Sequence, residues 1–357
     1  MTFDIAKISS AVPAGQADDP FSGVIFVQQG DAQIFAQGYG FANRAEQIPN
    51  RVNTRFGIAS GCKVFTGVAI CQLVGAGKLS FDTRLADCLD IDFPHFDPDI
   101  TVGQILTHSS GIPDYFDEEI MDDEEYELLW RERPMYLMRS PRDMLPLFQN
   151  EPMKFAPGTR FSYSNAGFIV LGLIVEQQSG MPFTEYVAQH IFAPAGMDDS
   201  GYFALDQLPA RTASGYILDE GDEGAEDGQW RTNIYSIPII GGPDGGAFTT
   251  APDMAKFWDA LLGHRLLSAE MTATMLTPHI ATGDDDETLE RFYGYGVWIT
   301  KSRGELRSYY AIGGDPGVAF ISEYFVAEAL LVTLLGNTEN ALWEICGPVI
   351  DAARASL

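Results

Sequence analysis

Strand-like segments occur at both ends of this 357-residue chain, and a long stretch with helical patterns separates them. Near the N-terminus, two apolar runs within residues 21–40 flank Gly30 and Asp31, which is the pattern of a β-hairpin. Toward the C-terminus, apolar runs predict further strands and a closing helix, over residues 293–300, 307–312, 318–323, 329–336 and 339–355. Strands so far apart in sequence can share one sheet only if the stretch between them is an insertion.

The middle of the chain carries the helices. Residues 166–175 are apolar on every face, so this segment should form a fully buried helix. Thr101 stands where an N-cap begins a helix, and residues 214–232 read as a polar, Gly-rich loop. We therefore expect an α/β domain with a central antiparallel sheet, an inserted and mainly helical domain, and an active site between them. The expected boundaries are 1–85 with 240–357 for the first domain and 86–239 for the second.

Composition limits the partners of the chain. Because 46% of the residues are hydrophobic, the chain should fold. The formal net charge of −28 argues against nucleic acids and anionic membranes as partners. The four cysteines have no metal or disulfide spacing, and no apolar run is long enough for a membrane span. The N-terminus lacks a signal peptide, which predicts a cytoplasmic protein unless an export signal precedes the given sequence. The acidic runs at residues 117–125, 219–227 and 284–290 should be solvated loops.

Ser60 and Lys63 begin an apolar helical run that ends at Gly75 and Gly77. Positions three apart share a helix face, so the lysine would point at the serine from one turn further along. A serine hydroxyl needs a neighbouring base to become a nucleophile, and a partly desolvated lysine can be that base. The alternative is an N-cap serine followed by a solvated lysine.

Tyr163 and Asn165 form a second candidate group, in the Tyr-Ser-Asn stretch that precedes the apolar helix. A tyrosine beside an activated serine can act as a general base if a cation such as Lys63 stabilises its phenolate. The Asn165 amide can bind a substrate amide or Lys63. The alternative is a turn with an Asn cap. His108 follows the helix that Thr101 begins, and we expect a structural role for it.

Taken together, these motifs resemble the serine β-lactamase and penicillin-binding-protein superfamily, in particular the branch of class C β-lactamases, D-alanyl-D-alanine peptidases and esterases. The resemblance covers residues 20–340. Besides the two motifs it includes Tyr39-Gly40-Phe41-Ala42-Asn43-Arg44, Leu106-Thr107-His108-Ser109-Ser110-Gly111, Phe155-Ala156-Pro157-Gly158, Pro194-Ala195-Gly196-Met197 and Pro316-Gly317. It implies a β-lactamase/transpeptidase-like fold, in which an antiparallel sheet is flanked by helices and carries an inserted helical domain.

The resemblance also implies a role for each site residue. Ser60 would be the acylated nucleophile, Lys63 and Tyr163 would share the work of general base and acid, and Asn165 would position the acyl side chain of the substrate. The backbone N–H groups of Ser60 and Gly314 would form the oxyanion hole.

The third motif of the family departs from its pattern here. Where the family has Lys-Thr-Gly or His-x-Gly, this chain has Ala311-Ile312-Gly313. The family's cation helps to bind a substrate carboxylate, so its replacement by Ala311 predicts weak activity on β-lactams. Asp315 would make the pocket more negative.

The sequence therefore predicts a serine hydrolase that acts through a Ser60 acyl-enzyme on a small ester, amide or peptide-like substrate, as an esterase or a D-amino-acid peptidase or amidase. It would need no cofactor and no metal, and the sequence does not indicate an oligomeric state. The alternative is a catalytically silent penicillin-binding-protein homologue that binds peptide-like ligands or partners. The presence of Ser60, Lys63 and Tyr163 argues against this alternative, and Ala311 argues mildly for it.

Overall fold

A large antiparallel sheet organises the computed structural model, which describes residues 5–12, 20–219, 229–286 and 288–356. Eight strands are hydrogen-bonded in the order β2-β1-β14-β13-β12-β11-β10-β9, and every neighbouring pair is antiparallel. Their bounds are β1 Gly23–Gln29, β2 Ala32–Tyr39, β9 Ile280–Ala281, β10 Glu290–Tyr293, β11 Trp298–Ser302, β12 Glu305–Asp315, β13 Val318–Phe325 and β14 Leu330–Gly336.

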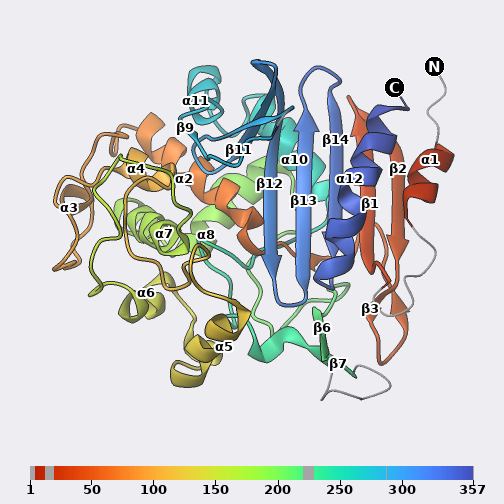
Figure 1. Cartoon of the computed structure of the whole chain (residues 1–357), viewed down its shortest axis with the longest axis horizontal. Coiled ribbons are helices and arrows are strands. Elements are labelled where there is room, and N and C mark those ends of the chain that lie inside the picture. Colours follow the sequence, from red (N-terminus) through yellow and green to blue (C-terminus); the bar gives the residue numbers. More distant parts are fainter. Residues whose placement is uncertain (1–4, 13–19, 220–228, 287, 357) are drawn as a thin grey trace.

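Strands from the two ends of the chain pair within this sheet. The predicted N-terminal hairpin is confirmed as β1 and β2, with Gly30 in the turn at a φ of +53° that favours glycine. β1 then pairs with β14, so that Val27 lies opposite Val332. The expected antiparallel sheet made from both chain ends is therefore confirmed (Figure 1).

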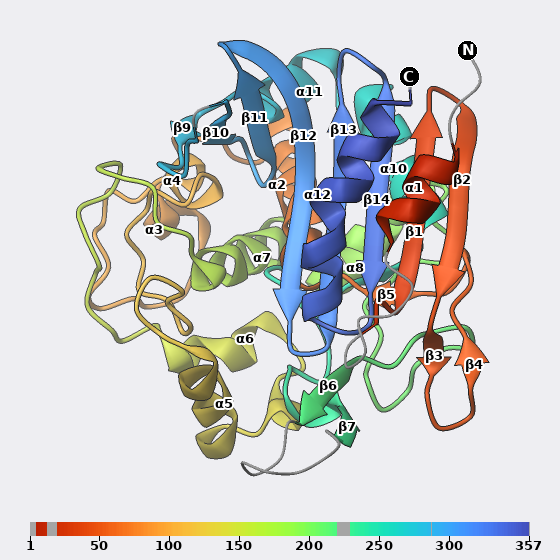
Figure 2. The ribbon, with the colours of Figure 1, turned by 45° about the vertical axis from the view of Figure 1, so that its right-hand side comes forward.

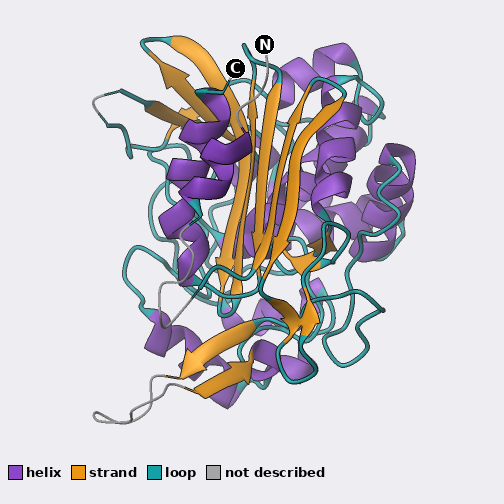
Figure 3. Ribbon diagram, turned by 90° about the vertical axis from the view of Figure 1, so that its right-hand side faces the viewer, coloured by secondary structure: helices purple, strands orange, loops and turns teal. Residues whose placement is uncertain are grey.

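Alternating side chains of the strands divide between two cores, one on each face of the sheet. Val24 and Phe26 of β1 pack in one core, and Ile25 and Val27 pack in the other. Helices lie on both faces, as Figure 2 and Figure 3 show. One core contains residues of α2 (Lys63–Gly75), α7 (Asn165–Ser179) and α10 (Ala251–Leu262), and the other those of α1 (Ile5–Ala11) and α12 (Asn340–Arg354).

The stretch between the N-terminal and C-terminal strands is mainly helical, as predicted. Helices α3, α4, α5, α6 and α7 lie to the left of the sheet in Figure 1. The expected buried helix is α7, in which every residue from Asn165 to Val175 is buried, and Thr101 caps α4 through a capping box. The other helices are α3 Leu85–Cys88, α4 Val102–Leu106, α5 Asp123–Glu132, α6 Pro141–Met144, α8 Phe183–Val187, α9 Ala193–Ala195 and α11 Ala269–Met275.

Short strands and turns complete the fold. Three two-stranded sheets pair β3 with β4, β5 with β8 and β6 with β7. Their strands are β3 Phe41–Asn43, β4 Ile48–Pro49, β5 Phe56–Gly57, β6 Tyr216–Asp219, β7 Gln229–Thr232 and β8 Phe248–Thr249. Single turns of 3₁₀- or π-helix are η1 Ala59–Cys62, η2 Met135–Leu137, η3 Leu145–Leu147, η4 Ala188–Phe192 and η5 Asn233–Tyr235.

Two local predictions are wrong. Residues 214–232 are not one loop, because β6 and β7 form a ribbon in which Tyr216 lies opposite Thr232. The short apolar run of β6 leads directly into the second acidic run, most of which lies outside the described residues. Residues 293–300 are not one strand either. The chain turns between β10 and β11, where Gly294 donates a hydrogen bond to the Val297 carbonyl and Gly296 has a φ of +78°.

The predicted boundaries of the two domains stay a prediction. All four cysteines are free thiols. Within the described part of the chain, no helix has the length and apolar character that a membrane crossing requires.

Candidate active site

Ser60 and Lys63 meet at a junction of two kinds of helix. Ser60 lies in the 3₁₀ turn η1, and Lys63 is the first residue of α2, so the serine precedes the α-helix instead of occupying its first turn as predicted. Ala59, just before the serine, has a φ of +43° that is uncommon for a side-chain-bearing residue. The Lys63 amine lies 2.9 Å from the Ser60 hydroxyl, as the spacing of the two residues predicted.

The Lys63 amine is enclosed by three oxygen atoms. Besides the serine hydroxyl, it contacts the side-chain oxygen of Asn165 at 2.7 Å and the backbone carbonyl of Asp244 at 2.6 Å. Only 1% of Lys63 is exposed, which rules out a solvated lysine. Burial lowers the pKa of Lys63, and the negative charge of Asp244 partly offsets that shift.

Tyr163 lies against both members of this pair. Its ring centre is 4.8 Å from the Lys63 amine, and its hydroxyl hydrogen-bonds with Ser60. Burial, with the charge of Glu118, raises the pKa of Tyr163 well above its usual value. This shift opposes the phenolate that a tyrosine base requires, so Tyr163 is a neutral phenol beside the serine.

His108 holds the other side of the Tyr163 ring. The two ring centres are 4.4 Å apart, and the Nδ1 atom of His108 accepts a hydrogen bond of 3.0 Å from the backbone N–H of Ser164. Burial lowers the pKa of His108 well below its usual value, so the imidazole is neutral. These contacts agree with the structural role expected for this histidine.

Asn165 is the first residue of α7, and it is not the helix cap. The cap is Ser164, whose hydroxyl accepts from the backbone N–H of Gly167. The Asp114 carboxylate accepts from the backbone N–H groups of Asn165 and Ala166, at 2.6 and 2.9 Å. The side chain of Asn165 is therefore left to contact Lys63, while its amide nitrogen lies 3.4 Å from a carboxylate oxygen of Glu118.

Strand β12 forms the opposite wall of the site. Gly313 packs so closely on η1 that a Cβ atom there would lie 2.7 Å from the Ser60 nitrogen, which only glycine permits. Gly314 lines the same cavity as Ser60. Ala311 lies opposite Ser322 in the sheet, is 4% exposed and is not among the residues that line this cavity. The structure thus brings all the predicted site residues except Ala311 to the serine.

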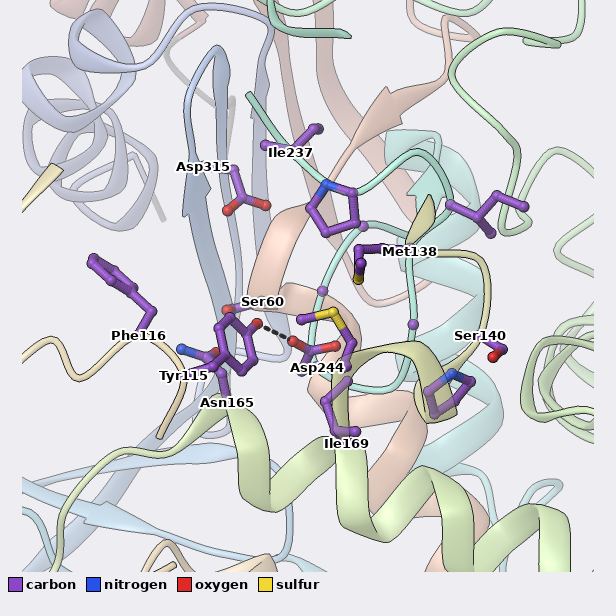
Figure 4. Close-up of a pocket in the computed structure, with 18 of the residues that line it drawn as sticks. Ser60, Tyr115, Phe116, Met138, Ser140, Asn165, Ile169, Ile237, Asp244 and Asp315 are labelled. Atoms are coloured by element: carbon purple, nitrogen blue, oxygen red, sulfur yellow. Dashed lines mark hydrogen bonds between the residues drawn. The ribbon is translucent and has the colours of Figure 1, made fainter. Parts of the chain in front are cut away.

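Several carboxylates surround the serine, and sequence reasoning missed Asp244 among them. Asp244 is 8% exposed, lines the cavity and accepts a hydrogen bond from the Tyr115 hydroxyl (Figure 4). Glu118 and Asp315 also line the cavity, and Asp315 is the one that the sequence indicated. Burial raises the pKa of Asp315 to about 7. The only sequence signal for Asp244 was its place between two Gly-Gly pairs.

The first acidic run was expected to be a solvated loop, and this is only partly correct. Asp117 is 8% exposed and pairs with Lys154 at 2.7 Å, and Glu119 pairs with Arg160 at 2.8 Å. Glu118 between them is exposed at the mouth of the cavity. No cluster of three or more His, Cys, Asp or Glu side chains that could hold a metal ion occurs in the described ranges.

Known proteins resemble this chain over most of its length. A penicillin binding protein from Bacillus halodurans, known as a crystal structure, is 51% identical, with a TM-score of 0.85 over 93% of this chain and 96% of that chain. Penicillin-binding protein 4* of Bacillus subtilis (strain 168) is 25% identical over 329 residues, which are 90% of this chain and 69% of that protein.

A D-stereospecific amidohydrolase from Streptomyces sp. is similar in fold, with 21% identity and a TM-score of 0.79 over 99% of both chains. These likenesses confirm the β-lactamase/transpeptidase-like fold that the sequence predicted. The family model described as Beta-lactamase matches residues 10–342, nearly the whole chain. The chain therefore belongs to the Beta-lactamase family of serine hydrolases.

Proposed function

We propose that this protein hydrolyses small esters or amides through an acyl-enzyme at Ser60, with Lys63 as the general base. The observation that carries the proposal is the set of three contacts around the Lys63 amine. Two of its partners, the Asn165 side-chain oxygen and the Asp244 carbonyl, can only accept hydrogen bonds. A neutral lysine keeps two N–H donors for these acceptors, so its lone pair is left to face the Ser60 hydroxyl, the one partner that can donate.

The reaction then proceeds in two steps. In the first, the Ser60 oxygen attacks the substrate carbonyl while its proton moves to Lys63, and the leaving group departs with a proton delivered by Lys63 or the Tyr163 hydroxyl. In the second, a water molecule gives a proton to the same pair, attacks the ester carbonyl and releases the acid, and Ser60 regains its proton. The backbone N–H groups of Ser60 and Gly314 would stabilise the oxyanion in both steps.

The charge around the serine supports a preference among substrates. Asp244, Glu118 and Asp315 all line the cavity near it, and Ala311 supplies no cation on β12. A substrate carboxylate at this end would meet negative charge without a matching partner, so β-lactams should be poor substrates. Uncharged or amine-bearing esters and amides fit better, and the likeness to a D-stereospecific amidohydrolase supports amides in particular.

The proposal is tested with chromogenic esters and a matched pair of serine variants. Ser60→Ala should lower kcat/KM by about 10³-fold or more, because one nucleophile carries the acyl transfer. Ser302→Ala, on β11, should keep the activity of the parent protein. If the folded parent protein shows no turnover that depends on Ser60 across a panel of esters and amides, the proposal fails and the silent homologue that binds ligands is favoured.

A further inference from the structure

The Ser60 cavity continues far beyond the serine, along helix α7. Three residues of this helix line it, namely Asn165, Ile169 and Glu176. They are separated by four and seven positions, so they form one stripe on one face of the helix. At 1.5 Å per residue, the stripe from Asn165 to Glu176 is about 16 Å long. The cavity is therefore much longer than a small acyl group.

The middle of this cavity is apolar. Met138, Met144 and Ile169 line it, and each is less than 10% exposed. Figure 4 shows Ser60 and Ser140 toward opposite ends, with Met138, Asp244 and Ile169 between them. We call the part lined by Met138, Met144 and Ile169 the α7 groove. Methionine side chains are flexible and polarisable, so they can adapt to an apolar ligand.

The far end of the α7 groove opens to solvent. Arg139, Ser140 and Pro182 line the cavity there, and all three are exposed. A chain that enters at Ser60 can thus pass the apolar middle and reach water again. The Asp244 carboxylate beside the groove accepts a hydrogen bond from the Tyr115 hydroxyl, so it already has a polar partner within the cavity wall.

We propose that the α7 groove binds an unbranched apolar chain on the acyl group of the substrate. This proposal rests on the proposed acylation of Ser60. The acyl group stays on the serine through both steps, so a groove that begins at the serine can hold it throughout. Three bonds of an extended chain span about 3.3–3.6 Å, so about 16 Å corresponds to roughly thirteen to fifteen bonds, or an acyl chain of about fourteen carbons. The acid product carries a negative charge. The carboxylates of Asp315 and Glu118 at the serine end would repel it and so favour its release.

The test compares p-nitrophenyl esters with acyl chains of two to eighteen carbons. Each methylene that leaves water should raise kcat/KM about two- to fourfold, since its burial contributes up to about 0.8 kcal/mol. The rise should continue to about fourteen carbons and then level off. A flat profile would overturn the proposal, and so would a rise that follows the length of the alcohol instead of the acyl chain.

Two variants locate the effect in the groove. Ile169→Trp narrows it and Met144→Gln makes it polar, so each should lower the ratio of kcat/KM for decanoate to that for acetate about tenfold or more. Both substrates are measured on the same preparation, so their ratio does not depend on the fraction of folded enzyme. If Ile169→Trp does not fold, Met144→Gln still provides the test. Gln177→Trp is the matched control, because this α7 residue is exposed and does not line the cavity. An unchanged ratio in both groove variants would contradict the proposal.

A binding measurement separates this proposal from the proposed catalysis. Calorimetry on Ser60→Ala with acetamide, butanamide, hexanamide and octanamide should show affinity that rises about two- to fourfold per methylene. That result would support ligand binding in the groove even if no ester is turned over. The absence of turnover would count against the proposed catalysis alone. No dependence on chain length in this measurement would overturn the groove, whatever the esterase activity.

Discussion

The two ends of the Ser60 cavity are built by different physical means. At the serine, Lys63 has three polar partners within 3 Å, and these contacts fix the position of its amine beside the Ser60 hydroxyl. In the α7 groove, buried methionine and isoleucine side chains make a surface that fixes no atom of a ligand in one place. The difference indicates that the serine end determines which bond is broken, and that the groove determines which substrates are held. Changes at the serine end should therefore alter kcat steeply, whereas changes in the groove should alter selectivity gradually.

The largest effect should come from Lys63→Met, which keeps most of the length of the side chain and removes the base. We expect kcat/KM to fall by about 10⁴-fold, the upper end of the effect of general-base catalysis. Lys78→Met is the control, because Lys78 is exposed beyond the end of α2. In the parent protein, kcat/KM should rise with pH as Lys63 loses its proton, at a pH below the usual lysine pKa because burial lowers it. A Lys63→Met protein with parental activity would remove the lysine from the mechanism.

Tyr163→Phe should have the next largest effect. It removes the hydroxyl that contacts Ser60 and keeps the ring between Lys63 and His108. Loss of one proton-transfer partner typically lowers the rate by about 10²–10⁴-fold, and we expect the lower part of that range in kcat, with little change in KM. Because Tyr163 is a neutral phenol here, its effect should be smaller than that of Lys63. A larger loss than in Lys63→Met would reverse these two roles.

A smaller effect should follow from Asp315→Asn, which tests the charge at the serine end. We expect kcat/KM for a carboxylate-bearing ester, relative to its methyl ester, to rise about two- to fivefold at pH 8, as for a partly screened charge contact. The rise should shrink below pH 7, because Asp315, with a pKa of about 7, is then increasingly neutral in the parent protein. Steady-state kinetics on the matched pair of esters measure this double ratio. An equal ratio in both proteins at pH 8 would show that Asp315 does not affect substrate choice.

The smallest expected effect is that of Asp315→Asn on thermal stability, and it should depend on pH. Burial raises the pKa of Asp315 to about 7 from its usual 3.8, so the folded protein favours the neutral acid. The resulting stabilisation is fully present below the unfolded-state pKa and is lost as the pH rises through about 7. Asparagine resembles the neutral acid, so Tm of Asp315→Asn should exceed that of the parent by about 1–3 °C at pH 8 and match it near pH 4. Thermal melts at both values, with exposed Asp90→Asn as control, check this.

Sequence reasoning reached the features whose signals are local. The spacing of Ser60 and Lys63 indicates their contact, and the apolar faces of residues 166–175 indicate the burial of α7. It could not reach contacts that only the fold creates. Tyr115 and Asp244 are 129 positions apart and meet in the cavity wall. The Asp244 carbonyl reaches Lys63 from a loop that carries no helical or strand pattern.

Ala311 shows the opposite limit of sequence reasoning. Its place in the third motif predicted a role in substrate binding, but the side chain is buried in the sheet and does not line the cavity. A strand sequence indicates which residues alternate, whereas the packing around the strand decides which of them a ligand can touch. The α7 groove was not predicted for the same reason, since its lining residues come from segments that only the fold brings together.

The most direct test of the central claim is the mass of the intact protein shortly after mixing with an activated ester. We expect a mass increase of one acyl group on the parent protein, located by peptide mapping at Ser60 and decaying as product forms. Ser60→Ala should show no such increase, and Lys63→Met should acquire it far more slowly. An adduct that persists in folded Ser60→Ala, or turnover by the parent protein without any adduct at Ser60 under rapid quench, would contradict the account.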